Sequence, residues 1–440
     1  MKNPAGSALV GTVFAEYAAS TSHTIRTLIT TKKETSMLKS LKKKPLTLLI
    51  STLSVASVNV FAATASVSKQ ANDIAQQTII IDSHIDVPYR VHEKWVDVAK
   101  SAEDGQFDYP RAKAGGLTAP FMSIYVPASL DSSAQSTQLA HILIDSVEAM
   151  VQRDPDKFAL ARSVDDVKQQ FKAGLISLPM GMENGSPIQG SLDNLELFYD
   201  RGIRYITLAH SQSNHISDSS YDLRRQWHGL SDFGKSLIPA MNNIGMLIDV
   251  SHVSDEAFYQ AIALSKTPLI ASHSSLRSFT PGFERNMDDK MVKALGKNGG
   301  VIMINFGSGF VTKEALQWRD GLTKARNALI KAEGENSEKL QNFDDTYRAE
   351  HPYPYSTLAD VLDHIDHVVK LIGIDHVGIG SDFDGVGDSL PTGLKDVSQY
   401  PNLVQGLLDR GYSRADIEKV LSGNFLRVWE QVEDYAASHS

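Results

Sequence analysis

Eight short apolar runs, rich in β-branched residues, recur along residues 63–440 and alternate with helix-like segments. The runs are continuously apolar rather than alternating, which is typical of parallel strands that are buried on both faces. We therefore predict eight parallel strands, over Thr78–Asp82, Ala119–Val126, Ile176–Met182, Ile203–Leu208, Met246–Val250, Pro268–Ala271, Gly300–Phe306 and His376–Gly380.

The segments between these runs predict helices, for example over Asp232–Ile244, Asp255–Ser265 and Leu358–Ile372. Eight such units predict an α/β fold, a closed (β/α)₈ TIM-like barrel of about 250 residues plus insertions. A doubly wound open sheet is the alternative, but no Gly-rich dinucleotide-binding pattern follows the first strand. The charged segment 307–355, between the seventh and eighth strands, predicts a helical insertion near the mouth of the barrel.

The N-terminal residues have the pattern of a processed leader. In the segment 37–62, four lysines precede a mostly apolar stretch, and Val60-Phe61-Ala62 predicts cleavage after Ala62. The apolar stretch is too short, and too rich in Ser and Thr, for a membrane span of about 20 residues, although an uncleaved anchor is the alternative. Met37 has the position of a natural start, so residues 1–36 are expected to be an over-extended reading frame. We expect residues 63–440 to form one catalytic domain.

Composition narrows the class of protein. The 43 Lys and Arg residues are outnumbered by 52 Asp and Glu, and this acidic balance argues against a nucleic-acid partner. The chain has no cysteine, which excludes disulfides and thiolate metal sites, so a metal would need His, Asp and Glu. An exported, acidic protein without cysteine fits a bacterial periplasm, with no stable membrane anchor after leader removal.

Ionisable side chains follow six of the eight predicted strands. In a barrel of this kind the chemistry gathers at the carboxyl ends of the strands. One such His or Glu alone is more often an ordinary loop residue, but charged residues beside strongly apolar runs are seldom buried without a partner or a metal. Seven at equivalent positions indicate a site, and they are His84, Asp86, Glu183, His210, His252, His273 and Asp382.

Five of these residues suit a pair of metal ions. His84 and Asp86, two residues apart on an extended segment, can chelate one cation. His252 and His273 come from neighbouring strands and can hold a second, while Glu183 can bridge the pair. Imidazole and carboxylate ligands suit two Zn²⁺ ions, with Mn²⁺ or Co²⁺ as alternatives.

The remaining two residues suit hydrolysis. Two metals about 3.5–4 Å apart bind a bridging water, lower its pKa and polarise a carbonyl. Asp382 is then left to take a proton from that water and pass it to the leaving amine, and His210 to stabilise an oxyanion. By contrast, His364 and His367 are three apart on a predicted helix, where ordinary helix residues are expected rather than ligands.

Eight motifs, in order, resemble the membrane (renal) dipeptidase family of zinc peptidases, within the amidohydrolase superfamily of metal-dependent barrels. They are DSHIDVP, GMENG, RYITLAH, GLSDFGKSLIPAMNNIGMLIDVSHVS, ASHSSLRS, ERNMDD, HVGIGSDFDGV and SGNFLRVWEQV, and they cover about residues 76–434. The resemblance implies the five ligands above and a substrate contact for His210. It also implies that Arg285 recognises the substrate, that Asp382 is the acid/base and can receive the substrate amine, and that the chain forms a homodimer.

The resemblance therefore implies a metal-dependent dipeptidase that hydrolyses dipeptides, including those with a C-terminal D-residue, with a metal-bridging hydroxide. One alternative is a hydrolase of another amide, such as a cyclic amide or an N-acyl amino acid; a lysine in place of Glu183 would have favoured it. Another is a non-catalytic periplasmic protein that binds dipeptides or metal. Departures from the family, such as Gly307 where a tyrosine is common and the long 307–355 insertion, leave substrate preference open.

Overall fold

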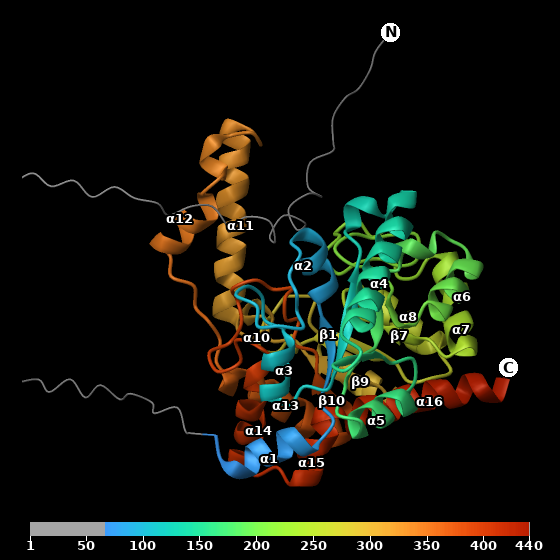
Figure 1. Cartoon of the computed structure of the whole chain (residues 1–440). Helices are drawn as coiled ribbons and strands as arrows, with labels where there is room; N and C mark the ends of the chain where they lie inside the picture. Colours follow the sequence, from blue (N-terminus) through green and yellow to red (C-terminus); the bar gives the residue numbers. More distant parts are fainter. Residues whose placement is uncertain (1–66, 440) are drawn as a thin grey trace, which may run out of the picture. The chain divides into compact units, whose positions relative to one another are not determined.

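The computed structural model describes residues 67–439, so the predicted leader over 37–62 and the extension over 1–36 lie outside the described residues. Its centre is an eight-stranded parallel sheet in the order β1-β2-β5-β6-β7-β8-β9-β10, and β3 and β4 form a separate two-stranded sheet (Figure 1). The strands are β1 (Ile81–Ile85), β2 (Ala119–Tyr125), β3 (Phe158–Leu160), β4 (Ile176–Leu178), β5 (Met180–Glu183), β6 (Ile203–Thr207), β7 (Leu247–Asp249), β8 (Ile270–Ser274), β9 (Val301–Ile304) and β10 (Val377–Ile379).

Helices follow most of the barrel strands, which confirms the predicted (β/α)₈ barrel. They are α1 (Lys69–Gln77), α2 (Val87–Glu93), α3 (Tyr109–Gly115), α4 (Ala134–Arg153), α5 (Val164–Lys172), α6 (Leu192–Asp200), α7 (Asp232–Ile244), α8 (Asp255–Leu264), α9 (Asp289–Asn298), α10 (Ser308–Val311), α11 (Lys313–Glu333), α12 (Phe343–Glu350), α13 (Leu358–Ile372), α14 (Tyr400–Asp409), α15 (Arg414–Glu418) and α16 (Asn424–His439). Within residues 67–439, no helix has both the length and the apolar character that a membrane span requires.

The barrel closes where the segment after β10 meets the first strand. The Asp86 amide donates to the Phe383 carbonyl at 2.9 Å, and the Asp382 amide donates to the His84 carbonyl at 3.1 Å. The buried Asp82 carboxylate reinforces this seam, because it accepts from the Ser381 amide at 2.9 Å. Closure therefore brings the last strand end against the first.

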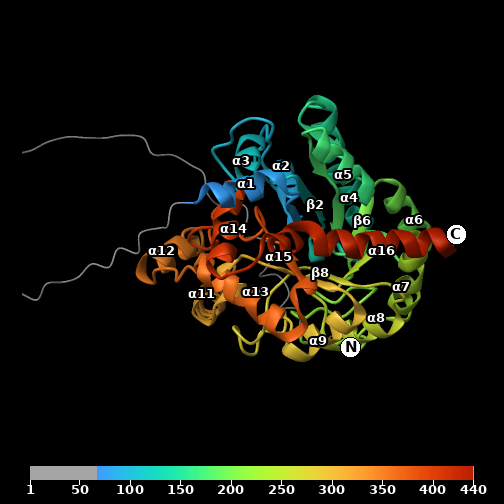
Figure 2. The same cartoon turned by 90° about the horizontal axis from the view of Figure 1, so that it is seen from below.

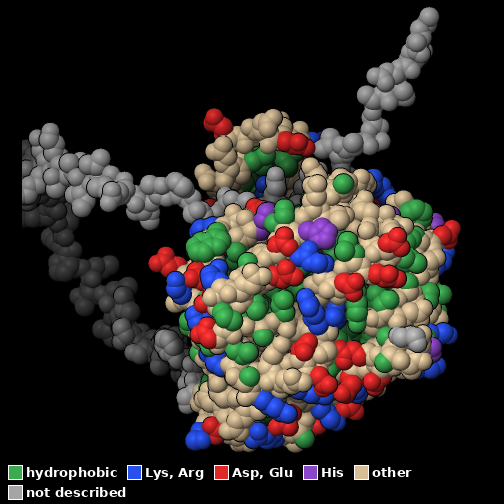
Figure 3. All heavy atoms as spheres, turned by 45° about the vertical axis from the view of Figure 1, so that its right-hand side comes forward, with side chains coloured by type: hydrophobic (Ala, Val, Ile, Leu, Met, Phe, Trp, Pro, Cys, Tyr) green, Lys and Arg blue, Asp and Glu red, His purple; other side chains and the backbone are tan. Residues whose placement is uncertain are grey.

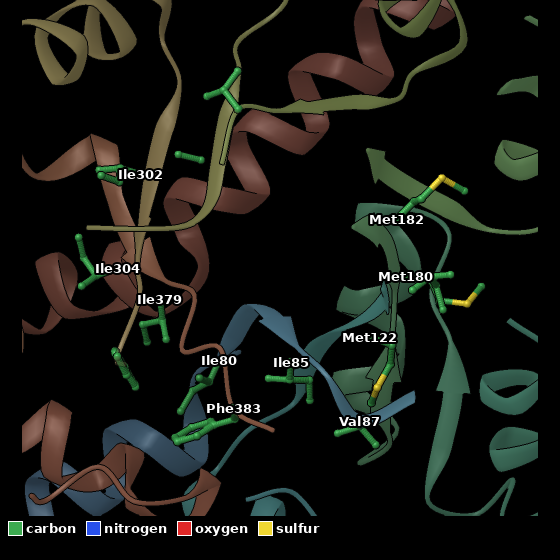
Figure 4. Packing of buried hydrophobic residues seen from close by; sticks show 14 of the residues in the cluster. Ile80, Ile85, Val87, Met122, Met180, Met182, Ile302, Ile304, Ile379 and Phe383 are labelled. Carbon is green, nitrogen blue, oxygen red and sulfur yellow. The ribbon is translucent and has the colours of Figure 1, made fainter. Parts of the chain in front are cut away.

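Two apolar layers surround the strands. Inside the barrel, Phe121 packs on Tyr205 and on Trp429 of α16, with ring centroids 5.5 and 5.3 Å apart. In Figure 2, which is a view from below, helix α16 runs across the end of the barrel that faces the viewer. Its apolar side chains fill that end of the barrel. Outside the barrel, Figure 4 shows residues such as Met122 and Ile304 in the layer between strands and helices. Since one end of the barrel is filled with apolar residues, polar chemistry is left to the carboxyl ends of the strands.

Two of the predicted helices have the predicted bounds. Helix α7 begins after Ser231, whose hydroxyl accepts from the Gly234 amide, and ends at Gly245, whose φ of 82° is left-handed. Helix α13 likewise covers Leu358–Ile372 as predicted. The 307–355 segment is helical, as expected, and its α11 projects from the barrel in Figure 1.

Three strand predictions were wrong in detail, and one of them, over Pro268–Ala271, is observed over Ile270–Ser274. The first strand covers 81–85 instead of 78–82, because the polar run after Ile81 is buried and keeps pairing with β2. The predicted strand Ile176–Met182 is two strands separated by Pro179, which has no amide hydrogen to donate. Its first part pairs with β3, a three-residue strand too short for the apolar pattern to reveal, and its second part joins the barrel.

Candidate active site

Glu183, at the end of β5, lies at the centre of four histidines. Its Oε2 atom is 3.3 Å from Nε2 of His84. Its Oε1 atom is 3.2 Å from Nε2 of His252, 3.3 Å from that of His273 and 3.4 Å from that of His210. The two carboxylate oxygens are thus divided between histidines from different strands. Burial raises the pKa of Glu183, but the neighbouring His84 outweighs that effect and helps to hold the pKa well below the ordinary value, so the carboxylate is ionised.

Hydrogen bonds fix which nitrogen of His273 carries a proton. The Ser272 hydroxyl donates to Asp249 Oδ2 at 2.6 Å, since a carboxylate only accepts. The Ser272 oxygen therefore accepts from Nδ1 of His273 at 2.7 Å. In the neutral imidazole, Nε2 then presents a lone pair, with Nε2 of His252 at 2.8 Å and the anionic Oε1 of Glu183 at 3.3 Å. A lone pair that faces an anionic oxygen in a buried site is stabilised by a cation between them.

His84 lies on the other side of the Glu183 carboxylate. Its Nδ1 is 2.8 Å from the Tyr205 hydroxyl, which lies inside the barrel. Its Nε2 is buried and has no hydrogen-bond partner, although Asp86 Oδ2 lies 3.5 Å away and Glu183 Oε2 is near. Asp86 itself is the N-cap residue of α2 rather than part of the strand, with φ −94° and ψ 29°. The predicted extended His84–Asp86 segment is therefore bent, yet both side chains still lie together.

These residues fit a pair of divalent cations. His84, Glu183 and His273 place ligand atoms within 4.8 Å of one another, and His84, Asp86 and Asp382 do the same. Burial lowers the pKa of His252 and of His273 well below the ordinary range, so both rings are neutral and can offer lone pairs. Imidazole nitrogens with carboxylate oxygens, and no thiolate, are ligands that suit zinc and related metals.

Asp382 lies beside this cluster, on the segment that closes the barrel. Its Oδ2 atom accepts from the Asn305 side-chain amide at 2.7 Å. Burial and the neighbouring Asp86 carboxylate raise the pKa of Asp382 to about 7. A carboxyl with a pKa near neutrality can both accept and release a proton at physiological pH. Asp382 and His252 are also the two site residues with left-handed backbones, at φ 64° and 70°, a conformation that is uncommon outside functional positions.

His210 lies as near to Glu183 as the other histidines, but on a more open side. Its side chain is 16% exposed, against 7% for His252 and 1% for His273. Burial lowers the pKa of His210, so the ring is neutral. Glu183, His210 and His252 also place ligand atoms within 4.8 Å of one another, and the greater exposure of His210 among them suits contact with a bound molecule.

Arg285 supplies a buried positive charge at the same end of the barrel. It is 3% exposed, and its guanidinium donates to Ser274 Oγ and to the His273 carbonyl, each at 2.8 Å. Its Nε is buried without a hydrogen-bond partner, and no carboxylate of residues 67–439 forms an ion pair with it. A buried guanidinium without a counter-ion is suited to an anionic ligand.

Comparison with known proteins agrees with this geometry. The family model "Membrane dipeptidase (Peptidase family M19)" matches residues 68–440. The chain belongs to the membrane dipeptidase family. Curated relatives of this family member include dipeptidase tcpJ of Claviceps purpurea, 34% identical over 341 residues (76% of this chain and 71% of that protein), and dipeptidase ataJ of Aspergillus terreus, 33% identical over 398 residues (83% and 88%).

Solved structures share the fold of this chain. The probable dipeptidase PvdM from Pseudomonas aeruginosa has a TM-score of 0.71 and 27% identity, covering 83% of this chain and 98% of that one. A metallopeptidase from Rhodobacter sphaeroides, liganded with a phosphinate mimic of the dipeptide L-Ala-D-Ala, has a TM-score of 0.67 and 24% identity, covering 81% and 99%. The family and barrel predicted from the motifs are confirmed, while the roles of individual site residues stay predictions.

Several residues at the site were not predicted. Tyr205, Asp249 and Ser272 hydrogen-bond to the histidines or to their partners, and Asn305 bonds Asp382. A signal was present in one case, because Asp249 is a carboxylate inside an apolar strand. Tyr205, Ser272 and Asn305 have no distinctive sequence pattern around them, and that local sequence does not predict which residues they orient.

His364 and His367 lie away from the cluster, as expected. The Leu276 amide donates to Nδ1 of His364 at 3.1 Å, and Nε2 of His364 donates to the Val311 carbonyl at 3.0 Å. His367 pairs with Asp289 at 2.9 Å. Both rings therefore join helix α13 to its neighbours.

Proposed function

We propose that this member of the membrane dipeptidase family is a dipeptidase that uses two Zn²⁺ ions. The observation that carries the proposal is the division of the Glu183 carboxylate, with Oε2 toward His84 and Oε1 toward His252 and His273. Asp86 completes the first set of ligands. Two zinc ions in these sets would supply an activated water and polarise the scissile carbonyl.

The chain's own residues perform the remaining steps. Asp382, held by Asn305, takes a proton from the attacking water at its free carboxylate oxygen and delivers it to the leaving amine. His210 lies on the more exposed side of Glu183, where it donates a hydrogen bond to the carbonyl oxygen as negative charge develops there.

Substrate length follows from charges at the two ends of a dipeptide. Arg285 lacks a carboxylate partner among the described residues, so its guanidinium can pair with the free carboxylate of the substrate. Asp382 can receive the substrate amine as well as the proton. A tripeptide would leave one of these charges unpaired. A C-terminal D-residue is within the proposed substrate range, as the L-Ala-D-Ala mimic bound by the Rhodobacter protein suggests.

A dipeptide panel tests the proposal. Purified protein loaded with zinc is incubated with L,L- and L,D-dipeptides and with matched tripeptides, with and without a chelator, and free amino acids are measured. Cleavage of dipeptides alone, lost with chelator and restored by zinc, is the expected result. Cleavage of tripeptides at the same rate would contradict the two-ended recognition, and no cleavage from folded, zinc-loaded protein would contradict the activity.

We also propose that the protein is exported, as the leader pattern over 37–62 predicts. Those residues lie outside the described part of the structure, so the support is the sequence pattern alone. N-terminal sequencing of the native protein is expected to begin at Ala63. A native protein that retains 37–62 would contradict cleavage.

A further inference from the structure

Arg319, on the long insertion, reaches the edge of the proposed substrate site. It lies in the second turn of α11, and its guanidinium carbon is 4.5 Å from the centroid of the Phe283 ring and 5.9 Å from that of Phe310. The same Phe310 ring is 5.5 Å from the guanidinium carbon of Arg285. One aromatic side chain is therefore shared by the arginine that faces the substrate carboxylate and by the arginine of the insertion.

Tyr221 connects Arg319 to the reacting residues. Burial raises the pKa of the Tyr221 hydroxyl, while the charges of Arg319 and Arg285 act to lower it and that of Asp382 acts to raise it. The Tyr221 ring lies 6.0 Å from that of His252 and 6.0 Å from that of Phe283. Arg319 is thus beside the site, separated from it by one layer of aromatic side chains that are themselves partly exposed.

The positive charge of Arg319 is poorly neutralised. The ion pair that it forms among residues 67–439 is with Asp320, at 3.8 Å and with the aspartate side chain 66% exposed. Nearby arginines have closer partners: Arg277 pairs with Asp255 at 2.6 Å, and Arg225 pairs closely with Glu284. The Arg319 side chain is only 27% exposed. A half-buried guanidinium with one weak counter-ion retains capacity for a second anion.

We propose that Arg319 is a specificity residue that favours dipeptides whose C-terminal residue carries an acidic side chain. The inference rests on the proposed function, because it takes Arg285 as the partner of the main-chain carboxylate. The Phe310 ring lies within 6 Å of both guanidinium carbons, so with that carboxylate on Arg285 the inference places the side chain of the same residue along this ring, toward Arg319. A Glu or Asp side chain at this position meets a guanidinium that can bind a carboxylate with two parallel hydrogen bonds.

Isosteric substrates test this inference. The kcat/KM values of L-Ala-D-Glu and L-Ala-D-Gln are compared, together with those of L-Ala-L-Glu and L-Ala-L-Gln. The wild-type protein is expected to favour the Glu substrate over its Gln counterpart by about tenfold, the effect of one charge-assisted hydrogen bond. Arg319→Gln is expected to bring that ratio close to one, with the larger loss of kcat/KM on the Glu substrate. Arg319→Lys is expected to keep part of the preference, because it keeps the charge but not the two-pronged geometry.

Arg326→Gln is the matched control. Arg326 lies on the same helix and pairs with Asp344 at 2.9 Å, so this variant removes one positive charge from α11 away from the aromatic layer. Its Glu-to-Gln ratio is expected to equal that of the wild type. A change of the same size in this variant would assign the effect to general charge and overturn the proposal.

Three other outcomes also decide the matter. A wild-type ratio of one, or a preference that persists in Arg319→Gln, overturns the role of Arg319. An equal loss on Glu and Gln substrates in Arg319→Gln assigns the residue a purely structural role and also overturns it. Hydrolysis of L-Ala-L-Ala tests the dipeptidase activity separately from the specificity. If the wild type cleaves this neutral substrate, the proposed function stands even where the specificity inference fails.

Discussion

Replacing Tyr205 by Phe removes a single oxygen from the interior of the barrel and is expected to weaken metal binding. The Tyr205 hydroxyl lies 2.8 Å from Nδ1 of His84, whose ring is fully buried. If Nε2 of His84 holds a metal, Nδ1 carries the proton and donates a hydrogen bond to the Tyr205 hydroxyl oxygen. The ring of the new Phe keeps its contact with Phe121, whose centroid is 5.5 Å away, so the fold is expected to persist.

The size of the effect follows from the lost hydrogen bond. Leaving the buried Nδ1–H of His84 without an acceptor costs about 1–3 kcal/mol. Loss of the partner of a metal-binding histidine typically reduces affinity by about 10–100-fold, which corresponds to roughly 1.4–2.7 kcal/mol. The two ranges agree, so Tyr205→Phe is expected to weaken one of the two zinc sites by about 10–100-fold and to leave the other nearly unchanged.

Zinc titration against a competing chelator of known affinity measures both sites. Tyr412→Phe is the matched control, because the Tyr412 hydroxyl donates to Asp366 Oδ1 at 2.6 Å in the outer helix layer. Circular dichroism checks that each variant is folded. A folded Tyr205→Phe protein that binds two zinc ions as tightly as the wild type would refute the orienting role of Tyr205.

Three further changes test other parts of the site and fold. Asp382→Asn should retain both metals and lower kcat by roughly 10²–10⁴-fold; loss of a metal from this variant would make Asp382 a ligand. Arg285→Met should raise KM most for dipeptides with a free carboxylate, and an equal loss with amidated dipeptides would contradict the pairing. Burial lowers the pKa of His364 from 6.5 to about 4, so the unfolded chain takes up this proton first as the pH falls. Stability present above pH 6.5 should thus be lost toward pH 4 by about 3 kcal/mol. Urea unfolding of His364→Gln should lack this component, and an unchanged pH profile in the variant would argue against it.

Surface charge also agrees with a small-molecule substrate. On the face shown in Figure 3, basic side chains are scattered among acidic and apolar ones rather than gathered into a patch. The chain carries a formal net charge of −9. Recognition of an anionic substrate is instead proposed for the buried Arg285 and for Arg319 at the edge of the proposed substrate site.

Much of the fold could be predicted from local pattern. Continuous apolar runs predicted all eight barrel strands, because a strand buried on both faces needs apolar residues at successive positions. Helix α7 was predicted to the residue, since Ser231 and Gly245 supply hydrogen bonding and a left-handed backbone at its two ends. The strand predictions failed where burial contradicted polarity, in β1, and where Pro179 divided an apolar run.

The residue types of the site were likewise visible along the chain. Polar and ionisable side chains at the ends of apolar runs stand out against their neighbours, and seven of them mark the site along the sequence. The sequence pattern could also indicate a carboxylate and imidazole ligand set, because the absence of cysteine excluded the alternative.

The arrangement of those residues depends on the closed barrel. His84 and Asp382 are about 300 residues apart, and they meet because the twist and register of eight strands bring the last strand against the first, an outcome that no local pattern contains. The partners that orient the ligands, Tyr205 and Ser272, are ordinary in sequence and gain a role only through neighbours across the barrel. Arg319 is one charge in a charged insertion until α11 places it against Phe283 and Phe310. Local chemistry determines which residues can react or bind, and long-range packing determines which of them face one another.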